Sequence, residues 1–269
     1  MKIGLEIHQQ INTKNKLFCN CNTDLKEDYK YRIERKLRAT LSETGKKDIA
    51  AEYETIKDKK YIYEYDKDYA CLVELDEEPP KYINLDALKF GILISTYFNM
   101  YIPRVLQIMR KIVVDGSNTS GFQRTLLLSL DGKLNYKNIG IGTLCIEEDA
   151  ARKIEEKDDY IIYRLDRLGI PLIEISTDPD IKDPKEAKEV AEYIGLILRL
   201  SGKVKRGLGT IRQDLNVSIE GGNKVEIKGV QNLKIIDKIV DLEAKRQEKI
   251  LELINIAKER GIEGYVLEE

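Results

Sequence analysis

The first residues of the chain alternate between apolar and polar side chains, as in a strand with one buried face. In the segment KIGLEIH, Ile3, Leu5 and Ile7 would share one face, and Glu6 and His8 would share the other. His8 is the only histidine of the chain. This polar pair could ligate a divalent cation or act as an acid and a base, or it could simply line a polar strand face.

Strand patterns recur further along the chain. Residues 24–60 are dense in charge and fit either a surface helix or an extended arm. Residues 57–80 alternate tyrosine with isoleucine and predict a hairpin. Pro79 and Pro80 would end this hairpin, because proline has no amide hydrogen to donate to a ladder. The strand-like pattern returns over residues 105–178, where glycine-containing turns interrupt it.

Other segments have the periodicity of helices. Asn84 is the expected N-cap of a helix over residues 84–100. Asp183 is the expected N-cap of a second helix, which Gly202 would end. A long amphipathic helix is expected over residues 233–261.

The order of these elements indicates the fold class. Residues 210–230 predict one more hairpin, with Gly221 and Gly222 in its turn. The strands are not separated by regular crossover helices, which a parallel sheet would need. We therefore expect one α+β domain over residues 1–269, with a mainly antiparallel sheet flanked by a few long helices.

Composition narrows the functional classes. The formal net charge of −2 argues against unspecific coating of nucleic acid and against DNA binding, although a specific RNA-linked substrate stays compatible with it. Four cysteines are too few for a disulfide framework in 269 residues, so we expect reduced thiols or a metal site in a cytoplasmic protein. No apolar run is long enough to cross a membrane.

Three strand-like stretches carry candidate acidic ligands. Glu147, Glu148 and Asp149 in GTLCIEEDAAR could bind a cation or belong to a solvated turn. Glu174 lies in an otherwise apolar strand, where a charged carboxylate is costly unless it is paired with a base or bound to metal. Arg212 and Asp214 are two residues apart and would share one strand face. Carboxylates with a single imidazole suit Mg²⁺ or Mn²⁺ better than a structural zinc ion.

Basic residues precede a loop rich in hydrogen-bond donors. Arg110 and Lys111 are followed by DGSNTSG, which contains Ser117 and Asn118. Such a loop can cradle a phosphate group, although it is no Walker motif and could equally be an ordinary connection.

Six motifs occur together and in order: GLEIHQQINTKNKLFCNC, CLVELDEEPP, DGSNTSGFQRT, EEDAAR, DRLGIPLIEISTDPD and GTIRQDLNVSI. In this combination the chain closely resembles the GatB/GatE family of glutamyl-tRNA(Gln) amidotransferases. The second and third motifs favour the archaeal GatE type over the bacterial and organellar GatB type. The resemblance extends from residue 2 to the last expected helix.

The resemblance implies a cradle-shaped, largely antiparallel sheet that holds ATP, Mg²⁺ and the aminoacylated 3′ end of a tRNA. The implied reaction activates the γ-carboxylate of Glu-tRNA(Gln) as an acyl phosphate, which ammonia converts to Gln-tRNA(Gln). The implied partners are this tRNA and an asparaginase-like amidase, GatD, that supplies the ammonia. A nonenzymatic alternative is an inactive cradle that binds only its partner protein or RNA.

The resemblance and the preceding patterns together assign the site residues. The expected metal ligands are Glu6, His8, Glu148, Glu174 and Asp214. The expected catalytic residues are Lys111, Asp214 and Glu148. The expected nucleotide and phosphate contacts are Arg110, Lys111, Ser117, Asn118 and Arg212.

The chain departs from the family pattern in two respects. Many GatB-type sequences carry two cysteine pairs of a zinc knuckle, whereas here Cys19 and Cys21 remain and the second pair is reduced to Cys71, with Glu74 nearby. These residues could bind zinc or be reduced thiols without a metal. The family also continues into an inserted synthetase-like domain, a helical domain and a tail domain, so this chain is expected to be a fragment or an unusually short family member.

Overall fold

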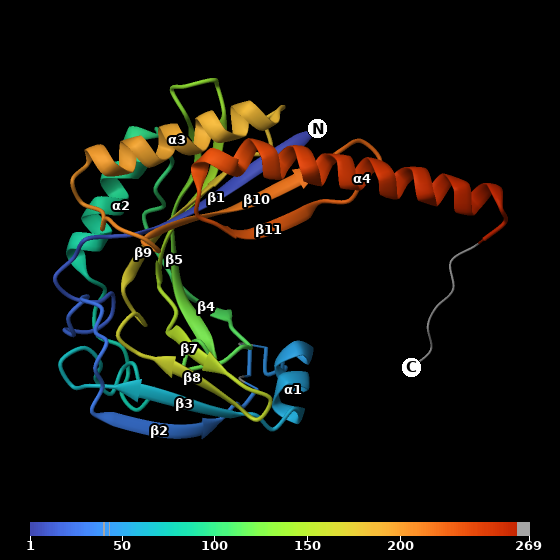
Figure 1. Cartoon of the computed structure of the whole chain (residues 1–269). Helices are drawn as coiled ribbons and strands as arrows, with labels where there is room; N and C mark the ends of the chain where they lie inside the picture. The colour runs from blue at the N-terminus through green and yellow to red at the C-terminus, as the bar shows by residue number, and fades with distance from the viewer. Residues whose placement is uncertain (40, 43, 263–269) are drawn as a thin grey trace.

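The computed structural model of the chain describes residues 1–39, 41, 42 and 44–262. It contains a seven-stranded and a four-stranded sheet, together with four α-helices (Figure 1). The strands are β1 (Lys2–Gln10), β2 (Tyr31–Lys36), β3 (Lys60–Tyr65), β4 (Ile108–Ile112), β5 (Phe122–Lys133), β6 (Gly140–Glu148), β7 (Arg152–Glu156), β8 (Tyr160–Arg164), β9 (Pro171–Thr177), β10 (Ile211–Ser218) and β11 (Val225–Val230). The helices are α1 (Ile49–Ile56), α2 (Leu85–Tyr97), α3 (Pro184–Leu200) and α4 (Ile236–Glu259).

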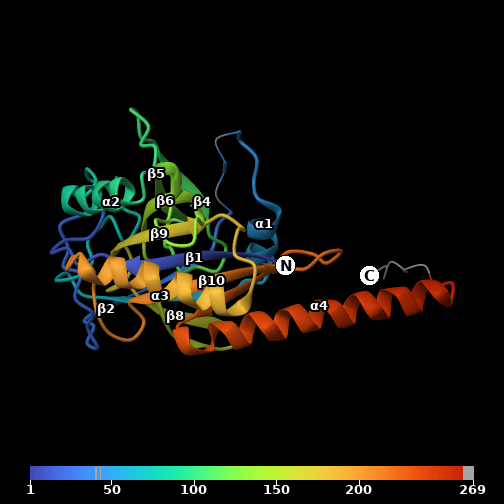
Figure 2. The same ribbon diagram turned by 90° about the horizontal axis from the view of Figure 1, so that it is seen from above.

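The larger sheet forms the centre of the molecule. Its strand order is β11-β10-β1-β9-β6-β5-β4, and every neighbouring pair is antiparallel. Helices α3 and α4 lie along the side of the sheet formed by β1 and β10 (Figures 1 and 2), and α2 packs against β5 and β6. Ile3, Leu5 and Ile7 are at most 1% exposed in the core between sheet and helices. The expected α+β class with a mainly antiparallel, cradle-like sheet is confirmed.

The four-stranded sheet corrects one sequence prediction. The expected hairpin over residues 57–80 is wrong, because β3 pairs with β2 on one side and, in parallel, with β8 on the other. Residues after β3 form turns instead of a return strand. The charged segment before β3 contains an extended strand, β2, and one short helix, α1. A separate core, with Tyr63 and Tyr163 at its centre, stabilises this sheet.

The expected starts of α2 and α3 are confirmed by their N-caps, whereas α2 ends at Tyr97, before the expected residue 100. The side chain of Asn84 accepts hydrogen bonds from the amides that begin α2, and Asp183 does the same for α3. Gly202 follows α3 with a positive φ of 67°, a conformation that glycine adopts without steric cost. The expected long amphipathic helix begins as a short 3-10 turn and continues as α4.

Helix α4 extends well past the sheet at its C-terminal end (Figure 2). The expected hairpin of β10 and β11 is confirmed, with Gly221 at a φ of 78° in its turn. Among the described residues, no helix is both long and apolar enough to cross a membrane.

Candidate functional site

One face of β1 carries the candidate site. Because Ile3, Leu5 and Ile7 are buried in the core, the alternating residues Glu6 and His8 project from the opposite face of the sheet. The prediction that these two side chains share one polar face is confirmed.

Strand pairing brings further polar residues to His8 from both neighbours of β1. Glu174 in β9 and Arg212 in β10 each lie directly opposite His8, and Asp214 in β10 lies opposite Glu6. Residues directly opposite each other on adjacent strands project from the same face. The site is therefore built across several strands that are far apart in the sequence.

The imidazole of His8 lies between carboxylates on its two sides. Its Nδ1 atom is 3.5 Å from Glu147 Oε1 and 3.7 Å from Glu174 Oε2. Its Nε2 atom is 3.8 Å from Asp214 Oδ2. Ligand atoms of two overlapping groups, His8 with Glu147 and Glu174, and His8 with Glu6 and Asp214, each lie within 4.8 Å of one another. We call these five residues the cation cluster.

The donor set of the cation cluster fits a divalent cation. His8 Nδ1 and Glu174 Oε2 are buried and have no hydrogen-bond partner within the part of the chain that the structure describes. Buried polar atoms normally have a partner, because leaving them unpaired costs free energy. Carboxylate oxygens with one imidazole suit Mg²⁺ or Mn²⁺.

The electrostatics of the cation cluster reflect its crowded carboxylates. Burial, and then the negative charge of Glu147, raise the pKa of Glu174 to about 7. Burial also acts to raise the pKa of Glu147, but His8 and Lys111 outweigh it and hold that pKa below its usual value. Two adjacent buried carboxylates thus differ in pKa, as expected when like charges repel and one lies closer to the cationic groups.

The structure places Glu147, rather than Glu148, in the cation cluster. Both oxygens of Glu148 are 3.2 Å from Arg124 Nη1 on the other face of β6, where burial raises the pKa of Glu148. The prediction that Glu148 joins the cluster is therefore wrong, because successive strand residues point to opposite faces. The sequence alone indicates this difference, because the apolar residues Leu144 and Ile146 alternate with Glu147. Both are fully buried, so Glu147 faces away from the core.

The same alternation separates Arg110 from Lys111 on β4. Lys111 lies opposite Gln123 and so projects from the same face of the sheet as Glu147, toward the cation cluster. Its positive charge helps to lower the pKa of Glu147 and partly opposes the rise in the pKa of Glu174. The guanidinium of Arg110 lies over the ring of Phe122, 5.4 Å from its centre, on the other face. Arg110 and Lys111 therefore project from opposite faces of β4 and do not form the expected joint phosphate site.

The loop that contains Ser117 and Asn118 is held by the smaller sheet. Ser117 Oγ donates to Asp115 Oδ1 at 2.6 Å, and the Tyr63 hydroxyl donates to the carbonyl of Gly116 at 2.8 Å. Both Ser117 and Asn118 are buried, and their contacts lie in the loop itself and at its junction with that sheet. Within the described chain, none of these hydrogen bonds joins Ser117 or Asn118 to the cation cluster, and their role in phosphate binding stays a prediction.

A large cavity borders this loop but lies away from the cation cluster. It measures about 680 Å³ and is bounded by residues 35–39, by residues 119–122 and by Tyr63. None of the cation-cluster residues lines it. This cavity is therefore not where the candidate chemistry is concentrated.

Comparison with known proteins agrees with this geometry. Residues 1–265 match the family described as the GatB/GatE catalytic domain. This chain belongs to that family. It is 56% identical over 262 residues to the E-type protein of the glutamyl-tRNA(Gln) amidotransferase of Saccharolobus islandicus, and 55% identical to the corresponding proteins of Saccharolobus solfataricus and Methanococcus maripaludis. These matches cover 94–97% of this chain but 41% of each relative.

In this GatB/GatE domain, a buried carboxylate organises the rim of the cation cluster next to His8. Asp149 accepts a hydrogen bond from Gln10 Nε2 at 2.7 Å. Its Oδ1 lies 3.7 Å from Arg167 Nε and 3.8 Å from Arg212 Nη1. Arg212 therefore lies beside the site, as expected. Arg167 was not predicted, because it lies in a turn whose position depends on tertiary contacts.

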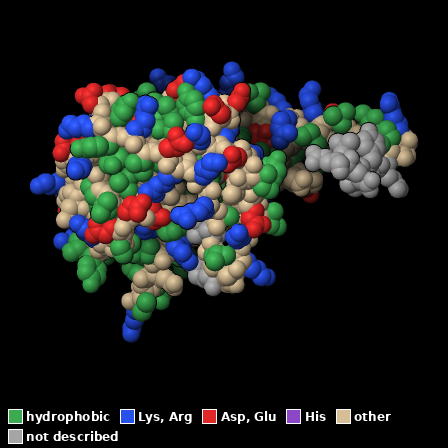
Figure 3. All heavy atoms as spheres, turned by 90° about the horizontal axis from the view of Figure 1, so that it is seen from below, with side chains coloured by type: hydrophobic (Ala, Val, Ile, Leu, Met, Phe, Trp, Pro, Cys, Tyr) green, Lys and Arg blue, Asp and Glu red, His purple; other side chains and the backbone are tan. Residues whose placement is uncertain are grey.

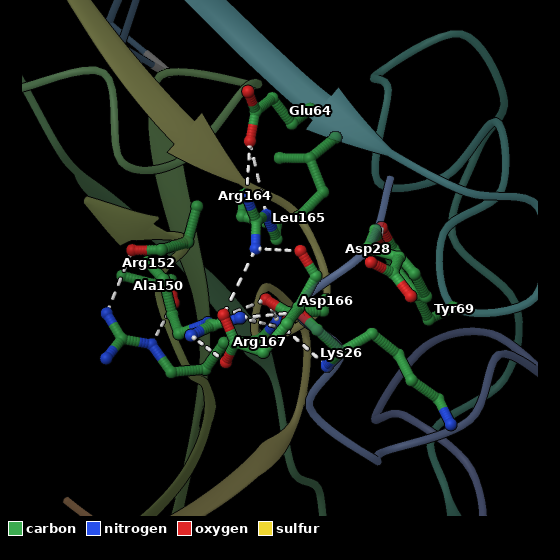
Figure 4. Close-up of polar contacts among 12 residues, drawn as sticks. Lys26, Asp28, Glu64, Tyr69, Ala150, Arg152, Arg164, Leu165, Asp166 and Arg167 are labelled. Atoms are coloured by element: carbon green, nitrogen blue, oxygen red, sulfur yellow. Dashed lines mark hydrogen bonds and ion pairs between the residues drawn. The ribbon is translucent and has the colours of Figure 1, made fainter. Parts of the chain in front are cut away.

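Figure 4 shows what fixes Arg167 and its surroundings. Arg167 donates to the backbone of Ala150, and ion pairs hold the neighbouring segments together. Arg164 pairs with Glu64 at 2.7 Å, and Arg152 pairs with Asp166 at 2.7 Å. These ion pairs join β8 and the turn after it to β3 and β7, and so hold the segment that carries Arg167.

Residues from β11 complete the other side of the cation cluster. The amide of Gly229 donates to Asp214 Oδ1 at 2.6 Å, and Lys228 Nζ lies 3.8 Å from Asp214 Oδ2. Gly229 has a φ of 71°, which allows the backbone to turn its amide toward Asp214. Sequence reasoning missed Lys228, because its position follows from the pairing of β11 with β10.

The domain contains a second group of potential ligands. Ligand atoms of Cys19, Cys21, Cys71 and Glu74 all lie within 4.8 Å of one another, and Cys19 Sγ is 2.8 Å from Glu74 Oε1. Burial raises the pKa of Cys71 to about 11. None of the four cysteines forms a disulfide, and Cys145 is buried in β6.

Proposed function

We propose that this chain is the part of a glutamyl-tRNA(Gln) amidotransferase that activates the γ-carboxylate of Glu-tRNA(Gln) with ATP and then forms the amide with ammonia. The observation that carries the proposal is the cation cluster, in which His8 lies among Glu147, Glu174 and Asp214. Family membership supports a role in tRNA-dependent amidation. Buried, unpartnered ligand atoms favour a working site over an inactive cradle, because they are costly when nothing binds them.

The cation cluster meets the electrostatic demand of the first step. A carboxylate must approach the γ-phosphate of ATP, and these two anions repel each other. Mg²⁺, when held by residues of the cation cluster, would supply positive charge that offsets this repulsion. Lys111 faces the same place from β4 and adds a second positive charge.

The two chemical steps are a phosphoryl transfer and an amide-forming displacement. A γ-carboxylate oxygen of the glutamyl group forms a bond to the γ-phosphorus of ATP, and the bond to ADP breaks. The nitrogen of ammonia then attacks the carbonyl carbon, and the phosphate leaves with the electron pair. Asp214 is positioned by the Gly229 amide to accept the proton that nitrogen loses. The acyl phosphate needs protection from water, which the bound tRNA end and neighbouring domains would provide.

We further propose that other proteins or domains supply ammonia and most of the tRNA affinity. The only histidine of the chain lies in the cation cluster, and the sequence offers no separate amidase nucleophile system. The surface in Figure 3 intersperses basic and acidic side chains, and the net charge is −2. Strong binding of RNA normally draws on several phosphate contacts with basic residues. An asparaginase-like amidase is the proposed ammonia source.

The test uses the chain assembled with its amidase partner and Glu-tRNA(Gln). We expect ADP release that depends on this tRNA, and Gln-tRNA(Gln) formation with added ammonium. Glu147→Gln and Glu174→Gln should each lower the rate by about 100-fold or more, since removing a ligand should cost at least as much as removing the groups that support ligands. Lys249→Ala on α4 serves as the control. Unchanged rates in both glutamate variants would refute the proposal.

A further inference from the structure

A second cavity opens beside the cation cluster, further along the same face of β1. It measures about 320 Å³, and Gly4, Glu6, Ser176 and Asn216 are among the residues that line it. Lys2 and Lys224 also line it. We call this cavity the Gly4 pocket. Glu6 belongs to both the Gly4 pocket and the cation cluster, so the two sites are contiguous.

Gly4 keeps the Gly4 pocket open. It lies inside β1, directly opposite Asn216, and its backbone is not in the left-handed region that would require glycine. A Cβ added at Gly4 would lie 3.5 Å from the Thr177 carbonyl oxygen and 3.9 Å from Asn216 Cβ, which are ordinary contacts. The fold therefore does not require glycine here. A glycine inside a strand is unfavourable, and it often marks a place where a ligand approaches closely.

Several residues that line the Gly4 pocket carry hydrogen-bond acceptors. The Oδ1 atom of Asn216 is buried and has no hydrogen-bond donor within the described part of the chain. The carboxylate of Glu6 provides a negative charge nearby, and Ser176 adds a hydroxyl group. An unpaired acceptor beside a carboxylate favours a cationic group with several N–H donors.

We propose that the Gly4 pocket binds the α-ammonium group of the glutamyl residue esterified to the tRNA 3′ end. This inference rests on the proposed function, because that function places the γ-carboxylate of the same residue at the cation cluster. Gly4 and Glu6 are two strand residues apart, or about 7 Å, a distance that an extended glutamyl group can bridge. Lys2 and Lys224 then lie where the phosphates of the terminal nucleotides would leave the pocket.

This arrangement gives the site a means of selecting its substrate. A free α-ammonium group donates to Asn216 Oδ1 and pairs with Glu6. An N-acylated glutamyl group has lost the charge and carries extra atoms, so it leaves Asn216 unpaired and does not fit over Gly4. The Gly4 pocket thus distinguishes an aminoacyl end from an N-blocked or peptidyl end.

The test measures equilibrium binding by calorimetry to the 269-residue chain, without ATP and without metal. The probe is 3′-glutamylamino-3′-deoxyadenosine, whose amide bond resists hydrolysis. The comparison ligands are its N-acetyl derivative and 3′-amino-3′-deoxyadenosine. We expect the probe to bind about tenfold or more tightly than either, which corresponds to ~1.4 kcal/mol. Equal binding of the N-acetyl derivative, or no binding of the probe at millimolar concentration, would overturn the proposal.

Two variants test the residues themselves. Gly4→Ala adds one methyl group without a clash in the folded protein, and Asn216→Leu removes the acceptor at similar size. Each variant should bind the probe about tenfold more weakly, whereas its affinity for the N-acetyl derivative should change little. Gly195→Ala on α3, where an added Cβ meets nothing within 4 Å, is the matched control. Thermal melts confirm that each variant is folded, and unchanged probe affinity in both folded variants would contradict the assignment.

The outcome is separate from that of the proposed function. Selective probe binding without tRNA-dependent turnover in the assembled enzyme would contradict the proposed function and leave the Gly4 pocket as an ammonium-binding site. Turnover with equal binding of both probe forms would retain the proposed function and reject the pocket assignment.

Discussion

His8 on β1 and Glu174 on β9 lie directly opposite each other, with Nδ1 of the imidazole 3.7 Å from Oε2 of the carboxylate. Both atoms are buried, and neither has a hydrogen-bond partner in the described part of the chain. The backbone pairing of two strands fixes this approach. A proton or a metal cation must therefore compensate the charge at this point, and the two compete for it.

The first prediction concerns pH in the metal-free protein. The pKa of Glu174 is about 7 in the folded chain, against an ordinary value of 4.5. Between these values the folded state binds more protons than the unfolded state, so the free energy of unfolding falls as pH rises. The loss is on the order of 3 kcal/mol. Urea unfolding with a chelator, from pH 5 to pH 8, measures it, and Glu174→Gln should show a shallower decline.

Added Mg²⁺ extends this prediction. Because the cation and the proton compete, Mg²⁺ should raise the melting temperature more at pH 8 than at pH 5. An equal rise in melting temperature at pH 5 and pH 8 would count against the role of this carboxylate. So would a free energy of unfolding that falls with pH as steeply in Glu174→Gln as in the parent chain.

The second prediction separates Glu147 from Glu148. Glu147→Gln should weaken Mn²⁺ binding by about tenfold or more and leave the fold intact, because it removes a ligand and relieves repulsion with Glu174. Glu148→Gln should cost about 3 kcal/mol of stability, because Arg124 loses its buried partner. Calorimetric titration and urea unfolding distinguish the two variants. The reverse pattern would restore Glu148 to the cation cluster.

The third prediction tests Lys111. Lys111→Ala should reduce phosphoryl transfer by about 100-fold, because the positive charge facing the cation cluster is lost. Its stability should change by less than about 0.5 kcal/mol, because the residue is exposed. The same substitution at the surface residue Lys249 is the control. Turnover that matches the control would remove Lys111 from the catalytic residues.

The fourth prediction addresses the second ligand group. We expect one Zn²⁺ per chain, bound by Cys19, Cys21, Cys71 and Glu74. Cys71→Ser should lower the zinc content measured by elemental analysis, and a strong chelator should lower the melting temperature. Cys145→Ser, outside this group, should retain the metal. Reduced thiols without zinc in the freshly purified chain would instead support the metal-free alternative.

Local sequence patterns determined much of the fold. The alternation in KIGLEIH fixed the buried face of β1 and the polar face of Glu6 and His8, because side-chain direction in a strand has a period of two. Asn84 and Asp183 determined where two helices begin, since their side chains satisfy amides that have no partner inside the helix. The same local rule, applied to the apolar residues of β6, would have selected Glu147 over Glu148.

Tertiary structure decided which strands pair and in which register. β3 pairs in parallel with β8, nearly a hundred residues away, and no local pattern indicates that partner. Likewise, Arg167 lies beside Asp149 at the rim of the cation cluster, and Lys228 lies beside Asp214, only because a turn and an edge strand pack there. Local propensity sets the conformation of a segment, whereas the partner of a strand depends on the burial and hydrogen bonding of the whole sheet. Glu6, His8, Glu174 and Asp214 were thus recognisable one by one, but only the order of the strands brought them together.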